Sequence, residues 1–123
     1  MSHEGIELLT QQITTPLQSI VRLAMNLRWV WNHATDEVWE ALAPDVWHQT
    51  HNPVLVIQNT PRSRLEELGR SLEFVEKVNR LDHSLSDYLA RPSWFQQTQS
   101  LERPLRIAYF SMEYGITEAL PLY

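Results

Sequence analysis

The sequence predicts a mainly α-helical protein: a small bundle of about five helices, then a linker and one β-strand that would begin an α/β domain. Apolar residues recur at helical spacing as far as Arg91. Helix starts are marked by Thr or Asn placed directly before proline, at three points along the chain. One short run of β-branched and aromatic residues follows Pro104. The predicted parts are a helical domain at 1–92, a linker at 93–104 and the truncated start of an α/β domain at 105–123.

Composition is that of a globular protein. The chain has 123 residues, of which 43% are hydrophobic and 20% charged, enough for one ordinary domain. Its net charge of -5 argues against a nucleic-acid partner, because phosphate binding needs a basic face. The lack of cysteine excludes disulfides and cysteine nucleophiles. An acidic start and no apolar run of about 20 residues predict a cytoplasmic protein without a membrane span.

The first predicted helix begins at Thr14-Thr15-Pro16, with a threonine cap before proline. It is expected to run for about sixteen residues and to end at Asn32-His33. Thr35 is expected to cap the second helix, with Asp36 and Glu37 at its positive end. The apolar stripes of these two helices are Leu17, Ile20, Val21, Ala24, Leu27 and Trp31, then Val38, Trp39 and Leu42.

Further starts follow at Pro44, Asn52-Pro53 and Thr60-Pro61. Gly69 is a predicted C-terminal stop. Ser71 is expected to cap a longer helix that ends before Pro92. The stripe of this helix is Phe74, Val78, Leu81, Leu85 and Tyr88.

The run 105–111 predicts a strand buried on both faces, as in a parallel sheet. A lone buried strand leaves its backbone N–H and C=O groups unpaired, and the sequence offers no second strand upstream. A parallel partner needs a crossover of a dozen or more residues. We therefore expect the sequence to stop, at Tyr123, just inside a larger α/β domain.

The segments Ala108–Ile116 and Glu118–Tyr123 resemble the opening of the catalytic region of bacterial and archaeal α-glucan (glycogen or maltodextrin) phosphorylases. Asn26–Asn32, with Trp47-His48 and His51–Val54, resembles the helical N-terminal domain of that family. The resemblance implies two Rossmann-like domains of a glycosyltransferase facing a cleft. It also implies pyridoxal phosphate on a late lysine, and phosphorolysis of α-1,4-glucan to glucose 1-phosphate in the complete enzyme.

The cofactor lysine and the glycine-rich loop that the family carries after its Pro-Leu-Tyr are missing from this sequence. Lys77 does not match the family's lysine and is predicted to be a solvated helix charge. The chain alone is therefore expected to be inactive, without catalytic or cofactor-binding residues of its own. Its expected partner is the rest of the catalytic domain, with glucan and phosphate as substrates of the complete enzyme.

Glu113 and Tyr114 are the candidate substrate-binding residues. The resemblance implies that Glu113 matches the Ser-x-Glu motif whose carboxylate faces the glucan cleft, and Tyr114 lies beside it. A carboxylate that caps a helix or pairs with an arginine is the alternative for Glu113. Glu113 with Glu118 also suggests the carboxylate pair of a glycoside hydrolase, which we consider the weaker interpretation.

The tryptophans favour core packing over sugar stacking, since Trp31, Trp39 and Trp47 are expected to face inward. Trp29 lies off the main stripe and is the candidate for docking against the catalytic domain. Exposed aromatics would instead favour a free-standing helical module that binds glucan or a protein partner.

His48 and His51 are three residues apart, but a zinc site needs three or four ligands. Hydrogen bonds from these imidazoles to loop backbone are the preferred interpretation. Asn52 before Pro53 is expected to cap a helix.

Overall fold

A computed structural model describes residues 15–98, 108 and 110 of the chain. The mainly helical fold class is confirmed, with more and shorter helices than expected. The elements, with 3₁₀-helices marked η, are η1 (Thr15–Leu17), α2 (Ser19–Met25), η2 (Leu27–Val30), η3 (His33–Thr35), α3 (Asp36–Leu42), α4 (Pro44–Thr50), α5 (Pro53–Asn59), α6 (Arg62–Arg70), α7 (Leu72–Ala90) and α8 (Trp94–Thr98).

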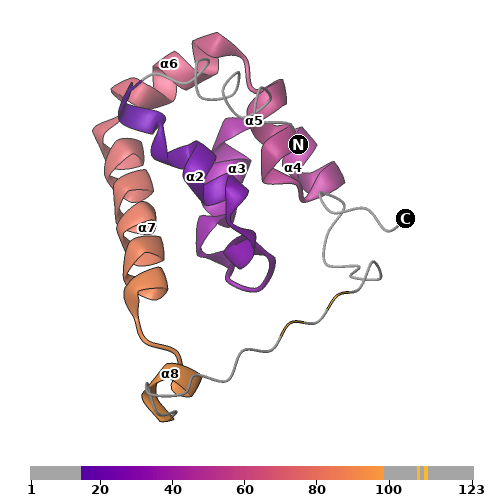
Figure 1. The fold of residues 1–123 in the computed structure, drawn as a ribbon. Coiled ribbons are helices and arrows are strands. Elements are labelled where there is room, and N and C mark those ends of the chain that lie inside the picture. Colours follow the sequence, from indigo (N-terminus) through magenta and orange to yellow (C-terminus); the bar gives the residue numbers. More distant parts are fainter. Residues whose placement is uncertain (1–14, 99–107, 109, 111–123) are drawn as a thin grey trace.

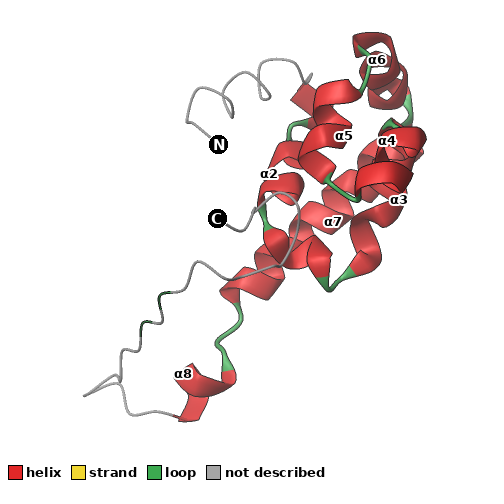
Figure 2. Ribbon diagram, turned by 90° about the vertical axis from the view of Figure 1, so that its right-hand side faces the viewer, coloured by secondary structure: helices red, strands yellow, loops and turns green. Residues whose placement is uncertain are grey.

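The helices form a bundle with α7 along one side (Figure 1). Helix α2 packs against both α7 and α5, and α3, α4 and α5 pack against one another on the far side of α2. Helix α6 crosses one end of the bundle and contacts α7 and η1. The short α8 lies beyond the other end of α7, away from the bundle in both views (Figure 2).

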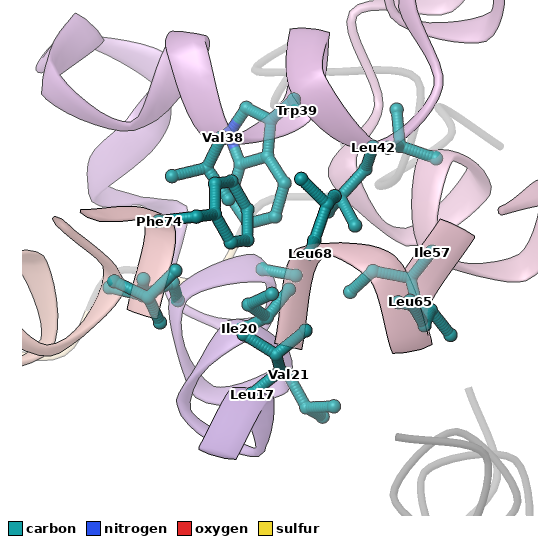
Figure 3. Close-up of a cluster of buried hydrophobic side chains, with 14 of the residues drawn as sticks. Leu17, Ile20, Val21, Val38, Trp39, Leu42, Ile57, Leu65, Leu68 and Phe74 are labelled. Carbon is teal, nitrogen blue, oxygen red and sulfur yellow. The ribbon is translucent and has the colours of Figure 1, made fainter. Parts of the chain in front are cut away.

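The core is one cluster of buried apolar side chains between α2, α3, α5, α6 and α7 (Figure 3). Leu17, Ile20, Val38, Trp39 and Val78 are fully shielded from solvent. Trp39 is anchored as well as buried, because its indole Nε1 donates to Thr35 Oγ1 at 3.1 Å. Since a buried aromatic contributes several kcal/mol through packing, Trp39 is central to the stability of the bundle.

The prediction of a single, continuous first helix is wrong. The segment is divided into η1, α2 and η2. The break between α2 and η2 lies at Asn26, whose backbone is extended. The Asn26 side chain accepts a hydrogen bond from the backbone N–H of Arg28 at 3.0 Å. Asparagine competes in this way with the helical ladder, so it ends α2 and begins η2.

Three predicted caps have different outcomes. Asn52 is confirmed, because its Oδ1 accepts from the backbone N–H groups of Val54 and Leu55. Thr35 does precede α3, but its hydroxyl accepts from Trp39 rather than from the helix backbone. Gly69 is not a stop: α6 continues through Arg70, and no described glycine has a positive φ.

Ser71 caps α7 as expected, accepting from the backbone N–H of Phe74 at 3.3 Å. Phe74, Val78 and Leu85 are buried, which confirms most of the predicted stripe. Tyr88 departs from it, with 46% of its surface exposed.

The predicted strand at 105–111 lies almost wholly outside the described residues. Ala108 and Phe110 are described, belong to no regular element and are exposed. In the predicted linker, α8 occupies Trp94–Thr98.

Candidate functional site

One end of the bundle exposes an aromatic and basic surface where η2 meets the last two turns of α7. We call it the η2–α7 surface and define it by Arg28, Trp31, Ser84, Tyr88 and Leu89. Trp31, Tyr88 and Leu89 are 61%, 46% and 56% exposed, although their side chains are large and apolar. Arg28 contacts Tyr88 and Ser84, and Trp31 and Leu89 lie close to Arg28 and Tyr88 along the chain. Exposed aromatic side chains beside an arginine are typical of contact surfaces rather than of a core.

The positions of Trp29 and Trp31 reverse the prediction. Trp29, expected to dock, is buried, and its indole Nε1 donates to the backbone carbonyl of Ala24 at 3.1 Å. Trp31, expected in the core, is exposed. The break at Asn26 causes the exchange, because η2 turns at three residues per turn and changes which side chains face α2.

Arg28 is held by aromatic and hydroxyl groups. Its guanidinium carbon lies 4.5 Å from the centre of the Tyr88 ring, and Nη1 donates to Ser84 Oγ at 3.4 Å. The cation–π contact restrains the guanidinium, which keeps further N–H donors for another partner. Within residues 15–98, Arg28 forms no ion pair with a carboxylate.

Arg22, on α2 and six residues before Arg28, differs in this respect. Its Nη1 pairs with the carboxylate of Asp82 and also donates to Ser86 Oγ at 3.0 Å. Arg22 therefore has its counter-charge inside the bundle and ties α2 to α7, whereas the charge of Arg28 is available to a partner.

A small hollow adjoins this surface between η2, η3 and α7. Its volume of about 20 Å³ suits one water molecule and is too small for a sugar ring. Asn26, Arg28 and Ser84 line its polar side, and Trp29 and Leu85 line its apolar side. The surface is therefore suited to contact with a macromolecule, not to enclosing a substrate.

The predicted substrate-binding residues, Glu113 and Tyr114, lie outside the described residues, as does Glu118. The two histidines are described and have other partners than loop backbone. His48 Nε2 lies 3.0 Å from Glu40 Oε1, and the His51 ring packs on Trp47 with centroids 5.1 Å apart. His51 also ends α4 in a left-handed conformation, with φ of 47°.

Lys77 pairs with the carboxylate of Glu37, joining α7 to α3 at the surface. The hydrogen bond and the charge of Lys77 lower the pKa of Glu37 from its ordinary value of 4.5. This pair explains Lys77 as a surface bridge between two helices.

Among the described residues, no three His, Asp or Glu side chains come together as metal ligands. No helix in the described part of the chain is long and apolar enough to cross a membrane. Fold and surface together define a small helical bundle with an exposed aromatic and basic surface at one end.

Comparison with known proteins gives the family. Residues 13–120 match the family described as "Protein of unknown function (DUF3417)", and the chain belongs to it. It is 38% identical over 113 residues to a glycogen phosphorylase from Mycobacterium tuberculosis, and 33% identical over 109 residues to a maltodextrin phosphorylase from Thermococcus litoralis. These matches cover 87% of this chain.

The chain spans 13% of the length of each of these two curated relatives. A glycogen phosphorylase from Aquifex aeolicus is 27% identical over 107 residues, with 15% of its length covered. No solved structure matches the chain significantly. The resemblance to the N-terminal region of α-glucan phosphorylases is thereby confirmed in both bacterial and archaeal relatives.

Proposed function

We propose that this chain is the N-terminal part of an α-glucan phosphorylase, in which the helical bundle serves as a docking scaffold for the catalytic part. The supporting observation is the match, along 87% of the chain, to enzymes named glycogen and maltodextrin phosphorylase. In the proposed boundaries, 1–92 is the helical domain, 93–104 the linker and 105–123 the beginning of the catalytic domain.

The proposed reaction is phosphorolysis by the complete enzyme. A phosphate oxygen bonds to the anomeric carbon of the terminal glucose, the α-1,4 bond to the next sugar breaks, and the released 4-oxygen takes a proton. The products are glucose 1-phosphate and a glucan shortened by one unit. Glu113 and Tyr114 are proposed to hold glucan hydroxyls in that enzyme, and its proposed location is the cytoplasm.

Pyridoxal phosphate is part of the proposal for the complete enzyme only. Lys77 is the one lysine of the sequence, and its ammonium forms an ion pair with Glu37 on the bundle surface. The described residues thus do not fit a cofactor site.

The test is an assay of glucose 1-phosphate release from maltodextrin, phosphate and pyridoxal phosphate. We expect release by a full-length phosphorylase that carries this chain as its N-terminal part, called the long enzyme below. We expect no release by the 123-residue chain. A matched reaction without phosphate separates phosphorolysis from hydrolysis. Release by the isolated chain, or glucose release without phosphate by the long enzyme, would contradict the proposal.

A free-standing module that binds glucan is the second candidate, favoured by the 61% exposure of Trp31. Aromatic faces stack on sugar rings, so binding of maltoheptaose should shift the tryptophan fluorescence of the isolated chain. Trp31→Ala is the test variant and Trp94→Ala the matched control, since Trp31 and Trp94 are both exposed whereas Trp29 and Trp39 are buried. A flat titration of the unaltered chain contradicts this candidate.

A further inference from the structure

We propose that the η2–α7 surface is the docking face for the catalytic part of the same polypeptide, and that the segment seated on it brings a carboxylate to Arg28 and an apolar side chain to Trp31. This inference rests on the proposed function, because it takes the occupant to be the rest of an α-glucan phosphorylase.

The first argument is the unequal length of the packed helices. Helix α7 has 19 residues, or about 28 Å, whereas α2 has 7 residues, or about 10 Å. The stripe that is buried at Leu85 continues three and four residues later at Tyr88 and Leu89, on the same side of the helix. The last turn of α7 thus carries a core-type face that the described helices leave exposed.

The second argument is the position of Trp31. It is the C-cap residue of η2, and its backbone N–H donates to the carbonyl of Arg28, so a short 3₁₀ turn fixes its position. A large exposed aromatic on a fixed backbone position is suited to act as an anchor in a partner's pocket, because burying its ring removes a large apolar area from water.

Charge identifies the chemistry of the occupant. Arg28 is stacked on Tyr88 and has no carboxylate partner in residues 15–98, while neighbouring Arg22 is paired with Asp82. A guanidinium preorganised by stacking binds a carboxylate with two parallel hydrogen bonds. The seated segment is therefore acidic at one position and apolar beside it.

Chain length identifies the source of the occupant. The matching phosphorylases are several times longer than this chain, which covers 13% of them. The C-terminal end of α7 lies at this same end of the bundle, and α8 follows it (Figure 1). Whatever follows residue 98 in a phosphorylase is tethered next to this surface, so its effective concentration there is high.

Limited proteolysis tests the docking directly. Trypsin cuts after arginine unless proline follows. In the segment after α7, Arg106 precedes Ile107 and is the cleavable site, whereas Arg91 and Arg103 each precede a proline. In the long enzyme, Arg28→Glu and Trp31→Ala should each raise the cleavage rate in this segment by about tenfold, because undocking opens it. Leu72→Ala, at the exposed residue of the opposite end of α7, is the matched control and should leave the rate unchanged.

The same proteolysis experiment on the isolated 123-residue chain is the second part of the test. There the same variants should change the cleavage rate by less than about twofold, because nothing is docked to be released. Helical circular dichroism of each variant confirms that the bundle is intact. Unchanged cleavage in the long enzyme overturns the proposal, and so does equal acceleration in the isolated chain.

Other occupants are distinguished on the isolated chain. Protection from iodide quenching by maltoheptaose that is lost in Trp31→Ala and kept in Trp94→Ala would make glucan the occupant, since both indoles are exposed. A dimer in sedimentation that dissociates on Trp31→Ala would make it a second copy. Either result overturns the proposal. Glucose 1-phosphate release by the unaltered long enzyme is measured separately, so loss of the proposed function and loss of the docking face are told apart.

Discussion

The two ends of helix α7 place one amphipathic stripe in two environments. Between Phe74 and Leu85 the stripe is covered by η1, α2 and α6 and forms part of the core. At Tyr88 and Leu89 the same spacing continues, but the side chains are about half exposed. Periodicity therefore identifies which residues share a face, while the length of the neighbouring helices decides which of them are buried.

The largest expected difference between the two ends comes from the same substitution made twice. Leu85 is 2% exposed and Leu89 is 56% exposed on the same helix. Leu85→Ala should lower the free energy of unfolding by about 2–5 kcal/mol, through lost transfer energy and a cavity. Leu89→Ala should change it by no more than about 0.5 kcal/mol.

Urea denaturation of the isolated chain, followed by circular dichroism, measures both variants. Equal losses would show that the end of α7 is packed as firmly as its middle. That result would also remove the unequal-length argument for the docking face.

The tryptophan pair sharpens the comparison at η2. Trp29→Phe removes the hydrogen bond from Nε1 to the Ala24 carbonyl and leaves that site underfilled, so a loss of about 1–3 kcal/mol is expected. Trp31→Phe keeps an exposed aromatic and should be neutral within about 0.5 kcal/mol. Thermal and urea unfolding measure the free energy of unfolding of both variants. A larger loss of stability for Trp31→Phe than for Trp29→Phe would favour the arrangement expected from the sequence.

That exchange shows where sequence reasoning reached its limit. The helical class, the starts at Pro44 and Pro53 and the stripe from Phe74 to Leu85 follow from proline, caps and periodicity, which are local signals. A single side chain decided the break at Asn26, and the spacing of apolar residues across it remains compatible with one continuous helix. Once a helix was assumed there, Trp29 and Trp31 were assigned to the wrong faces.

The candidate surface depended on non-local facts. Stacking of Arg28 on Tyr88 joins residues 60 positions apart along the chain, and no local pattern predicts it. The exposure of Tyr88 depends on where α2 stops. The substrate residues Glu113 and Tyr114 remain predictions from resemblance, because they lie outside the described residues.

A cap inside the bundle gives the next smaller effect. Asn52 is 6% exposed, and its Oδ1 accepts from two backbone N–H groups at the start of α5. Asn52→Ala should cost about 1–2 kcal/mol, because those donors lose their partner in a buried place. Asn52→Asp, which retains an acceptor, should recover most of the loss in urea unfolding. Failure of Asp to do better than Ala would indicate that the amide packs rather than caps.

The smallest effect concerns the surface bridge between Glu37 and Lys77, which joins the packed part of α7 to α3. Lys77 lowers the pKa of Glu37 in the folded chain below its ordinary value of 4.5, so the unfolded chain binds the proton more readily. The bridge thus stabilises the fold at neutral pH, and its contribution fades as the pH falls from 4.5 through the lowered folded pKa.

Glu37→Gln should reduce the unfolding free energy slightly at pH 7, and the difference from the unaltered chain should disappear in acid and shrink in high salt. Glu76→Gln, beside Lys77 and without an ion pair among the described residues, is the matched control. A difference that grows in acid would reverse the sign and exclude Lys77 as the cause of the lowered pKa.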